Sequence, residues 1–391
     1  MAPTAVGDHR AAESEMAVEA ASVAVRSEQL VSSGLWVELA EHELAAWNDR
    51  LLLTEASLTQ YPYWNEPYRM SRLRPRYIAW NAGGRWVAYA CVLTADLPGF
   101  RIGLVFRGPV NLLPGQELPN AVLRGLYRWA KQKRYAFLRF THAGPGLLNA
   151  IAALGHSQPR DAFPFFEDMG AAYHELVVDQ LQYDGAMLAE FDREARRKIC
   201  RAEEAGYTIQ FDDRPETLAS NWGTFLECSR RRQFHFHRGL EHYLKLLELA
   251  RPHNCARVYT ASLNGRALAA SLVVRDRDTA FCYLAALDVS GLEGRPTPAF
   301  LLHWRAMRDL YKVGVCHYNF GPGTGKVGFF KQQFSPRTIT YPPPVTLVTN
   351  RFLYALWCAV LPGLRRAWPA VKPLAWSVAK LLQSSSGRIS E

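Results

Sequence analysis

The stretch that decides the fold is His317-Tyr-Asn-Phe-Gly-Pro-Gly-Thr-Gly-Lys-Val-Gly-Phe-Phe-Lys-Gln-Gln-Phe334. We expect a strand over residues 315–320, then a glycine-rich loop, then aromatic residues around a single lysine, Lys331. Glycines let backbone amides approach a ligand closely, so the loop is a candidate binding site. It is not a phosphate-binding P-loop, because Val327 follows Lys326 where that motif needs Ser or Thr. A flexible surface loop is the alternative interpretation.

The order of elements on either side of this stretch repeats along the chain. In the first half we expect a helix from Trp36 to Thr54, then a hairpin, a strand, a helix and a strand, at residues 77–93, 103–106, 118–133 and 136–140. In the second half we expect a helix, three strands, a helix and a strand, at residues 192–205, 257–263, 267–274, 279–287, 298–312 and 315–320. This order predicts a mixed α/β (α+β) protein of two lobes, each a mostly antiparallel mixed sheet flanked by helices.

The lobes and the chain ends can be bounded from composition. We expect a disordered leader over residues 1–28, lobes over 29–180 and 181–345, and a basic amphipathic helical tail over 346–391. The tail intersperses Trp357, Trp368 and Trp376 with basic residues, which suits a helix lying in a membrane interface. Helices packed on the body and broken at prolines are an equal alternative.

Composition limits the class of protein. The chain has 391 residues, of which 49% are hydrophobic, so a globular fold needs no metal or disulfide. Its net charge of +10 favours polyanionic partners such as nucleic acid, anionic lipid or phosphorylated metabolites, although a basic protein without such a partner is also consistent. Seven scattered cysteines without a CxxC pair predict reduced thiols and a cytoplasmic location, with membrane association through the tail as an addition.

Two basic stretches are candidate binding segments. On the helix at residues 193–206, Arg196 and Lys198 flank a buried stripe and could reach into a cleft, or could belong to a solvated basic face. The second stretch, Arg230-Arg-Arg-Gln-Phe-His-Phe-His-Arg238, interleaves aromatic and basic residues as a nucleic-acid contact does. Its candidate tRNA contacts are Arg230, Arg231, Arg232 and Arg238. His235 and His237 lack an evident third ligand, so we expect no metal site.

Taken together, these stretches resemble the Fem-type aminoacyltransferases, the family that includes the enzymes building peptidoglycan interpeptide bridges. The resemblance spans roughly residues 55–340. In chain order it rests on Arg107-Gly-Pro-Val110, Leu138-Arg-Phe140, His174-Glu-Leu-Val-Val-Asp179, the helix from Arg196 to Gly206, and Tyr318-Asn-Phe-Gly321 followed by Phe330-Lys331.

The resemblance implies two GNAT-like lobes around a substrate cleft, an aminoacyl-tRNA donor, and an amine acceptor on a phosphorylated or lipid-linked molecule. It implies that Lys331 is catalytic, near the reacting carbonyl, and that Phe330 shapes the pocket. It also implies that Arg196 holds an acceptor phosphate, with Arg69 as a further basic contact and Asn319 as a binding residue. Asn319 stands where the family usually has Asp, and the long coiled-coil arm of several members is absent, since only about fifty residues separate Gly206 from the strand at Arg257.

Three functions follow from this set of features. The first is an aminoacyl-tRNA-dependent N-acyltransferase acting on an amine of a cell-wall precursor or related small molecule, with no bound cofactor. The second is an acyl-coenzyme A N-acyltransferase in polysaccharide or natural-product biosynthesis. Against it, Leu292-Glu-Gly-Arg-Pro-Thr-Pro298 lacks the [RQ]-x-x-G-x-[GA] loop of ordinary GNAT enzymes. The third is a non-enzymatic membrane or RNA adaptor.

Overall fold

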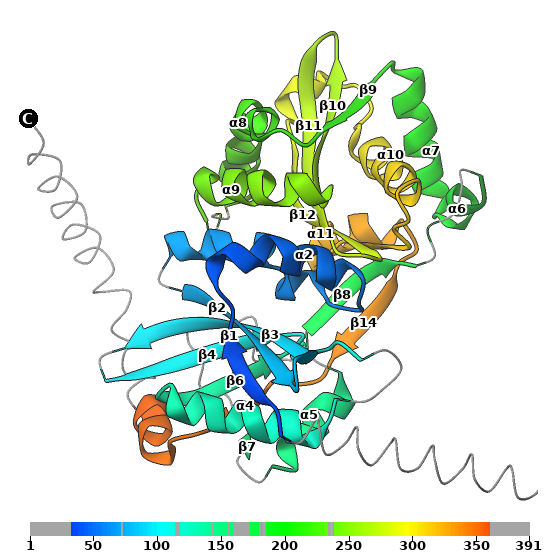
Figure 1. Cartoon of the computed structure of the whole chain (residues 1–391). Helices are drawn as coiled ribbons and strands as arrows, with labels where there is room; N and C mark the ends of the chain where they lie inside the picture. Colours follow the sequence, from blue (N-terminus) through cyan, green and yellow to red (C-terminus); the bar gives the residue numbers. More distant parts are fainter. Residues whose placement is uncertain are drawn as a thin grey trace, which may run out of the picture.

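The protein folds into two stacked lobes (Figure 1). The structure is a computed structural model that describes residues 33–359, apart from residues 72, 98, 114–117, 143, 155–156, 159–172, 180, 182–184, 234–235 and 237. Each lobe is built on one mixed sheet whose strands are antiparallel except for one pair, β4 with β6 in the first sheet and β12 with β13 in the second. The expected class and two-lobed architecture are confirmed.

The first sheet has the strand order β1-β2-β3-β4-β6-β15-β7, with β5 paired to β3. Its strands are β1 Leu35–Glu38, β2 Leu73–Ala82, β3 Arg85–Leu97, β4 Phe100–Phe106, β5 Val110–Asn111, β6 Tyr135–Thr141, β7 Ser157–Gln158 and β15 Val345–Val348. Its helices are η1 Glu41–Glu43, α2 Leu44–Leu52, η2 Leu58–Gln60, α3 Pro62–Asn65, η3 Glu66–Met70, α4 Asn120–Gln132 and α5 Pro145–Ala152.

The second sheet has the order β14-β8-β13-β12-β11-β10-β9. Its strands are β8 Tyr173–Val178, β9 Thr208–Asp212, β10 Ala256–Leu263, β11 Arg266–Arg275, β12 Thr279–Leu287, β13 His317–Asn319 and β14 Arg337–Tyr341. Its helices are α6 Gly185–Glu190, α7 Arg193–Glu204, α8 Pro215–Arg232, α9 Leu240–Ala250, η5 Arg251–His253, η6 Ser290–Leu292, α10 Ala299–Tyr311 and α11 Gly325–Gln332.

The chain crosses between the lobes in a way that the expected boundaries do not capture. β8 precedes residue 180 but pairs with β13 and β14, so it belongs to the second sheet rather than to the first lobe. β15 follows the second lobe but pairs with β6 and β7 of the first sheet. These pairings join residues far apart in sequence, which local patterns do not reveal. Both exchanges tie the two lobes together.

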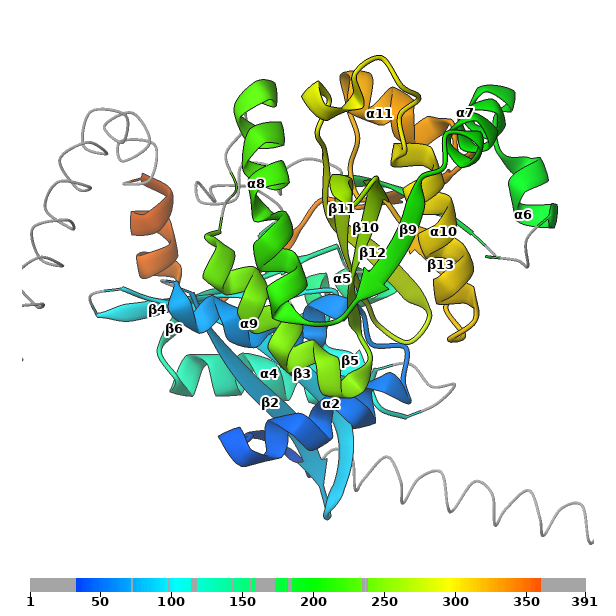
Figure 2. The same ribbon diagram turned by 90° about the horizontal axis from the view of Figure 1, so that it is seen from above.

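Helices fill the space between the two sheets. One hydrophobic core joins Trp47 and Leu51 of α2 to Phe225 of α8 and Leu246 of α9, and so spans both lobes. A second core lies under α7 and α10 on the other face of the second sheet, and a third lies under α4 and α5 on the other face of the first. Figure 2 shows α8 and α9 on one side of β10 to β12 and α7 and α10 on the other. The face of the second sheet toward the first lobe can therefore contribute to a site between the lobes.

The first expected helix differs in the structure. The predicted helix from Trp36 to Thr54 begins as strand β1, because Leu35–Glu38 pairs along the edge of β2. Trp36 packs edge-on against Trp80 there, with ring centroids 5.9 Å apart, and its indole donates to the Val122 carbonyl. This pairing outweighs the local helical pattern, and the α-helix starts only at Leu44.

The described part of the expected tail packs on the body. Residues 351–359 form a helix in which Trp357 is buried, with its ring centroid 6.3 Å from that of Phe137 on β6. Contact between the tail and a membrane stays a prediction, because residues 360–391, like the leader at residues 1–28, lie outside the described residues. Across the part of the chain that the structure describes, no helix has both the length and the apolar character needed to span a membrane.

Candidate active site

The two parallel strands of the second sheet, β12 and β13, pair over only three residues. Their last pair is Phe281 with Asn319, and beyond it the strands separate. Within β12, Tyr283 is an extra residue with no partner on β11, since Leu272 pairs with Leu284 and Val273 with Cys282. Such a bulge bends a strand and re-aims its side chains, and bulges are common beside active sites. In the first lobe, by contrast, the parallel strands β4 and β6 stay paired from Arg101 to Phe106.

Lys331 lies where β12 and β13 separate. The half-buried ammonium group donates to the carbonyl oxygens of Phe320, at 2.6 Å, and Pro322, at 2.5 Å. An ammonium group has three N–H donors, so one is left for a ligand. Burial lowers the pKa of Lys331, and the nearby Cys282 thiol opposes this shift only in part.

The glycine-rich loop before α11 is required for this arrangement. A Cβ atom on Gly323 would lie 3.0 Å from the Cα of Gly328 and 3.1 Å from the side chain of Lys331. The loop can therefore pack closely against α11 only with glycine at this position. This is the role of one of the glycines in the stretch from His317 to Phe334.

Phe330 packs into an aromatic cluster beside Lys331. Its ring meets Phe300 of α10 edge-on, with centroids 4.6 Å apart, and also contacts the buried His303. Lys198 of α7 joins the same cluster, since its ammonium lies 4.7 Å from the centroid of Phe300 and 3.2 Å from the Gln333 side chain of the segment after α11. The structure therefore brings together Phe330, Lys331 and Lys198.

Arg196 and Arg69 are placed differently. Arg196 is two residues before Lys198 on α7, hence about 160° away around the helix, and its side chain is exposed. It is thus directed away from the side of α7 that contacts the aromatic cluster. Arg69 on η3 pairs with Glu66, with Nε and Oε2 2.7 Å apart. The structure does not bring either arginine into contact with Lys331.

Asn319 belongs to a buried network that connects the lobes. Its side-chain amide donates to Glu175 of β8 at 2.7 Å, and its oxygen accepts from the backbone N–H of Gly321. Glu175 also accepts from Arg107 of the first lobe, at 2.5 Å, and from the Tyr341 hydroxyl at 3.1 Å. The Arg107 guanidinium lies over the Tyr341 ring, 4.8 Å from its centroid.

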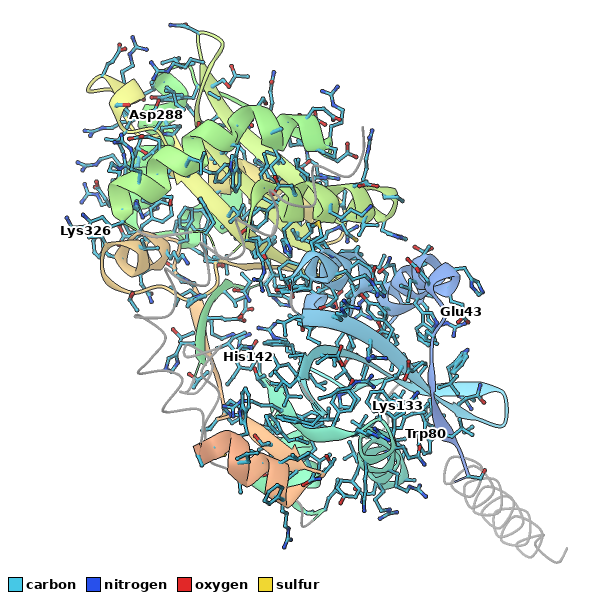
Figure 3. All side chains as sticks on the ribbon, turned by 90° about the vertical axis from the view of Figure 1, so that its left-hand side faces the viewer. Glu43, Trp80, Lys133, His142, Asp288 and Lys326 are labelled. Carbon is cyan, nitrogen blue, oxygen red and sulfur yellow. The ribbon has the colours of Figure 1, made fainter. Side chains whose placement is uncertain are left out.

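His142 stands at the edge of this network. It lies on the side of the first lobe that faces the second (Figure 3), with its ring centroid 5.4 Å from that of Tyr341. Burial, with the positive charge of Arg107, lowers the pKa of His142 to about 4. His142 is therefore neutral at physiological pH, and Arg107 and Glu175 carry the charges of the network.

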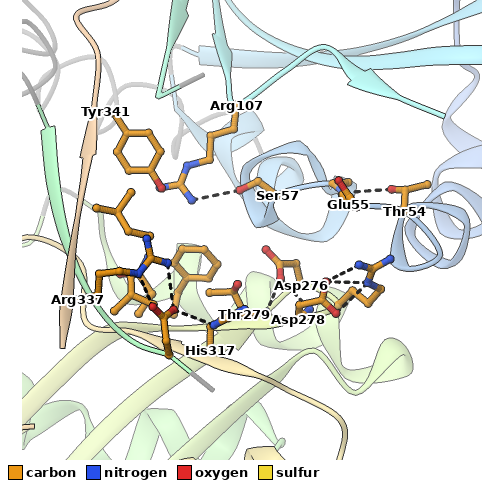
Figure 4. A pocket seen from close by; sticks show the side chains of 17 residues that line it. Thr54, Glu55, Ser57, Arg107, Asp276, Asp278, Thr279, His317, Arg337 and Tyr341 are labelled. Atoms are coloured by element: carbon orange, nitrogen blue, oxygen red, sulfur yellow. Dashed lines mark hydrogen bonds and ion pairs between the residues drawn. The ribbon is translucent and has the colours of Figure 1, made fainter. Parts of the chain in front are cut away.

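A cavity of about 330 Å³ opens beside the network, between the lobes (Figure 4). Its first-lobe wall is the segment from Thr54 to Ser57 together with Arg107. Its second-lobe wall includes Asn319, Phe281 and the turn from Asp276 to Asp278. Phe281 and Asn319 face this cavity, whereas Cys282 and Phe320, the next residue along each strand, face the core beneath α10. The cavity and the Lys331 side chain therefore lie on opposite faces of β12 and β13.

The basic end of α8 lies at the far end of β12. Arg231 donates to the carbonyl of Leu287, the last residue of that strand, at 3.3 Å. Arg230 pairs with Glu227, Arg232 is exposed, and Arg238 lies over the ring of Tyr68. His235 and His237 lie outside the described residues. Three of the four candidate tRNA contacts, Arg230, Arg231 and Arg232, thus lie near the C-terminal end of β12, where this strand is no longer paired with β13.

Comparison with known proteins identifies the class to which this site belongs. The family model of the GNAT acetyltransferase domain matches residues 189–331, from the end of α6 to Lys331. The matched segment contains the separating strands, the aromatic cluster and the lysine. The chain therefore carries a GNAT acetyltransferase domain, as expected of an acyltransferase.

Both lobes together have the fold of FemX. The FemX structure superimposes with a TM-score of 0.70 at 14% identity, covering 82% of this chain and 99% of that one. A protein of unknown function from Bacteroides thetaiotaomicron matches with a TM-score of 0.57 at 11% identity, over 80% of this chain and 99% of the other. The C-terminal domain of a putative lysylphosphatidylglycerol synthetase from Agrobacterium fabrum matches with a TM-score of 0.51 at 14% identity, over 83% and 97%. No curated protein sequence matches the chain.

Sequence reasoning missed the carboxylates of the inter-lobe region. Glu175 and Asp276 were not singled out, although Glu175 lies inside the strand matched to the family and Asp276 lies in an expected turn. Their burial could have been suspected from an acidic residue within an apolar strand and from an Asp in a tight turn. Their partners, just after β4 and on β13, β14 and η2, follow only from the tertiary fold.

Proposed function

We propose that the protein transfers an aminoacyl group from aminoacyl-tRNA to an amine on a phosphorylated or lipid-linked acceptor, such as a cell-wall precursor. The observation that carries this proposal is Lys331, which has one N–H without a partner among the described residues, at the point where β12 and β13 separate. That N–H can stabilise the oxygen of an acyl group as negative charge develops on it. One such donor contributes roughly 3 kcal/mol to lowering a barrier.

The chemistry requires no covalent enzyme intermediate. The amine nitrogen attacks the acyl carbon, the C–N bond forms, and the bond to the tRNA ribose oxygen breaks; one proton leaves the amine and one ends on the ribose hydroxyl. An aminoacyl ester is already activated, so orientation of the two substrates can supply much of the acceleration. The Cys282 thiol interacts electrostatically with Lys331, and burial raises the pKa of this thiol. It is therefore unsuited to act as a nucleophile.

The preference for tRNA as donor rests on the position of the basic end of α8. Arg231 contacts the end of β12, and strand geometry puts Leu287 roughly 20 Å from Phe281. The end of α8 lies on the face of β12 opposite Lys331. A polyanion held by Arg230, Arg231 and Arg232 could thus extend its acylated end along β12 and through the gap between β12 and β13 to Lys331. The fold matches that of FemX and that of a putative lysylphosphatidylglycerol synthetase domain, whose name refers to an aminoacylated lipid. Both similarities are consistent with such a donor and with a lipid-linked acceptor.

Acyl-coenzyme A is the second candidate donor, because the matched family is one of GNAT acetyltransferases. The segment before α10 disfavours it. Residues 292–298 lack the glycine pattern that would expose backbone amides to a pyrophosphate, and Pro298 occupies the N-cap position of α10. A proline at that position has no N–H to offer.

Labelled acyl transfer by the purified protein tests the donor directly. The protein is offered charged tRNA or acyl-coenzyme A, each with a panel of amine acceptors and each with and without RNase. The proposal predicts transfer from charged tRNA that RNase abolishes. Transfer from acyl-coenzyme A that survives RNase would replace it with the second candidate, and no transfer from either donor would contradict both.

A further inference from the structure

The inter-lobe cavity carries an excess of negative charge inside a basic protein. Three arginines line it, namely Arg107, Arg277 and Arg337, and each is paired with a carboxylate: Glu175, Asp278 and Asp179 respectively. His317 also lies against Asp179, at 3.0 Å. These pairs leave two lining carboxylates, Asp276 and Glu55, without a salt bridge to an arginine or lysine among the described residues, although Arg107 and Arg277 are near enough to interact with them. The chain as a whole has a net charge of +10, so this local excess is a specific feature of the cavity.

Asp276 is positioned to accept one further hydrogen bond. The residue is only 6% exposed and lines the cavity from the turn between β11 and β12. One oxygen accepts from the backbone N–H groups of Thr279 and Asp278, at 2.8 and 3.2 Å, and the other accepts from Leu58 of the first lobe at 3.0 Å. A carboxylate can accept about four hydrogen bonds, two on each oxygen. The oxygen that accepts from Leu58 can therefore accept one more.

Glu55 stands across from Asp276 on the first-lobe wall (Figure 4). Its side chain is exposed, so it lies at the open side of the cavity while Asp276 is buried within it. Phe281 and Tyr341 contribute aromatic surface to the same lining, against which an alkyl chain can pack. A negative group inside, a second at the entrance and apolar surface in the same lining fit a ligand with a positively charged end.

We propose that the cavity binds a ligand through a primary ammonium group on an alkyl chain, held by Asp276 and attracted by Glu55. Burial raises the pKa of Asp276 to about 6, so the group is ionised at neutral pH and available to pair with a cation. The cost of burying this charge is recovered when the ammonium ion enters, because an opposite charge at hydrogen-bond distance favours the ionised form.

This inference rests on the proposed function in one respect: the ammonium group is that of the acceptor, and it must lose a proton before its nitrogen attacks the acyl carbon. Phe281 and Asn319 form the cavity side of the strand pair whose other side faces Lys331. An acceptor held in the cavity would thus approach the separating strands from the face opposite the lysine.

Binding of n-pentylamine to the full chain, measured by calorimetry at neutral pH without any acyl donor, tests the inference. We expect pentylamine to bind and 1-pentanol, of the same length but uncharged, to bind at least roughly tenfold more weakly. Asp276→Asn should weaken pentylamine binding roughly tenfold, and Glu55→Gln about threefold. Glu248→Gln is the matched control, because Glu248 pairs with Lys245 on the surface of α9, outside the cavity lining, and should leave binding unchanged.

Equal affinity for the amine and the alcohol, no binding of the amine, or unchanged binding in both cavity variants would overturn the inference. Glu55→Gln keeps the test decisive if Asp276→Asn folds poorly, because Glu55 is exposed. Because no donor is present, the result is independent of the transfer assay. Transfer from charged tRNA by a protein whose cavity binds no amine would contradict this inference and leave the proposed function standing.

Discussion

The side-chain amide of Asn319 donates a hydrogen bond to Glu175, with Nδ2 and Oε2 2.7 Å apart. The same carboxylate accepts from Arg107 of the first lobe, so a strand end of the second lobe is joined to the first through one buried acid. This explains the departure from the family pattern at Asn319. An aspartate there would face Glu175 with a second negative charge, where the structure needs a donor.

Asn319→Asp should therefore destabilise the protein by about 2 kcal/mol or more at pH 7.5, because two carboxylates would be buried against each other. Lowering the pH toward 5 should recover part of this loss as the pair takes up a proton. The double variant Asn319→Asp/Glu175→Gln should regain most of the stability, since the introduced glutamine amide can donate to the introduced carboxylate. Denaturant unfolding of the wild type, the two single variants and the double variant measures the coupling. If Asn319→Asp alone proves as stable as the wild type, the role given to this hydrogen bond is ruled out.

Asp276 should impose its own pH dependence on folding. Its pKa is raised from 3.8 in the unfolded chain to about 6 by burial, so the folded state binds the extra proton between these values. Its contribution to stability is therefore fully present below pH 4 and is lost as pH rises through 6, by about 3 kcal/mol in total. The charged and titratable groups around it are Arg107, Arg277, Asp278, Glu55, Tyr61, Tyr63 and Cys255.

The comparison that isolates this effect is the difference in unfolding free energy between the wild type and Asp276→Asn, followed from pH 4 to pH 7.5. Asparagine does not titrate, so the difference should move in favour of the variant as pH rises. A difference that stays constant over this range would show that Asp276 has an ordinary pKa in the fold.

We expect the basic end of α8 to affect only the binding of the tRNA donor. Replacing Arg230, Arg231 and Arg232 together by Gln should raise the KM for charged tRNA roughly tenfold or more and reduce its dependence on salt, because up to three phosphate contacts would be lost. The fold should be retained, since Arg230 and Arg232 are exposed and Arg231 makes one partly exposed hydrogen bond. An unchanged KM and salt dependence would remove these arginines from the donor site.

The helix at residues 351–359 should contribute to stability through Trp357. Trp357→Ala should cost about 3 kcal/mol, because the indole is buried against Phe137 and its neighbours. Phe352→Ala is the matched control on the same helix, and should be nearly neutral because Phe352 is 75% exposed. Equal thermal stability of the two variants would contradict the packing of this helix on the first lobe.

Much of the fold could be predicted from the sequence because it is encoded locally. The Asn264-Gly265 turn defines the hairpin of β10 and β11, and the apolar pattern of Ala267 to Val274 defines a strand. The first-lobe hairpin around Gly83 and Gly84 is equally clear. The exchange of β8 and β15 between the lobes could not be predicted, because it depends on which edge of a sheet remains open once both lobes have formed.

The sequence motifs of the candidate site could be predicted, but the side-chain contacts within the site could not. Phe330 and Lys331 follow from the glycine-rich stretch, and the structure places both where β12 and β13 separate. The choice of Arg196 over Lys198 could not be settled by spacing, since both flank the buried stripe of α7, and only Lys198 reaches the aromatic cluster. Arg107 belongs to a recognisable motif, but its partner Glu175 is 68 residues away in sequence.

The central claim is that acyl transfer takes place at Lys331, and single-turnover transfer from labelled aminoacyl-tRNA tests it most directly. Lys331→Ala should lower the rate of the chemical step by about 10²-fold or more while the fold and tRNA binding are retained. Lys326→Ala is the control, because Lys326 lies on the same helix at the outer surface of the second lobe (Figure 3) and should react at the wild-type rate. A near-normal rate in Lys331→Ala would contradict the account.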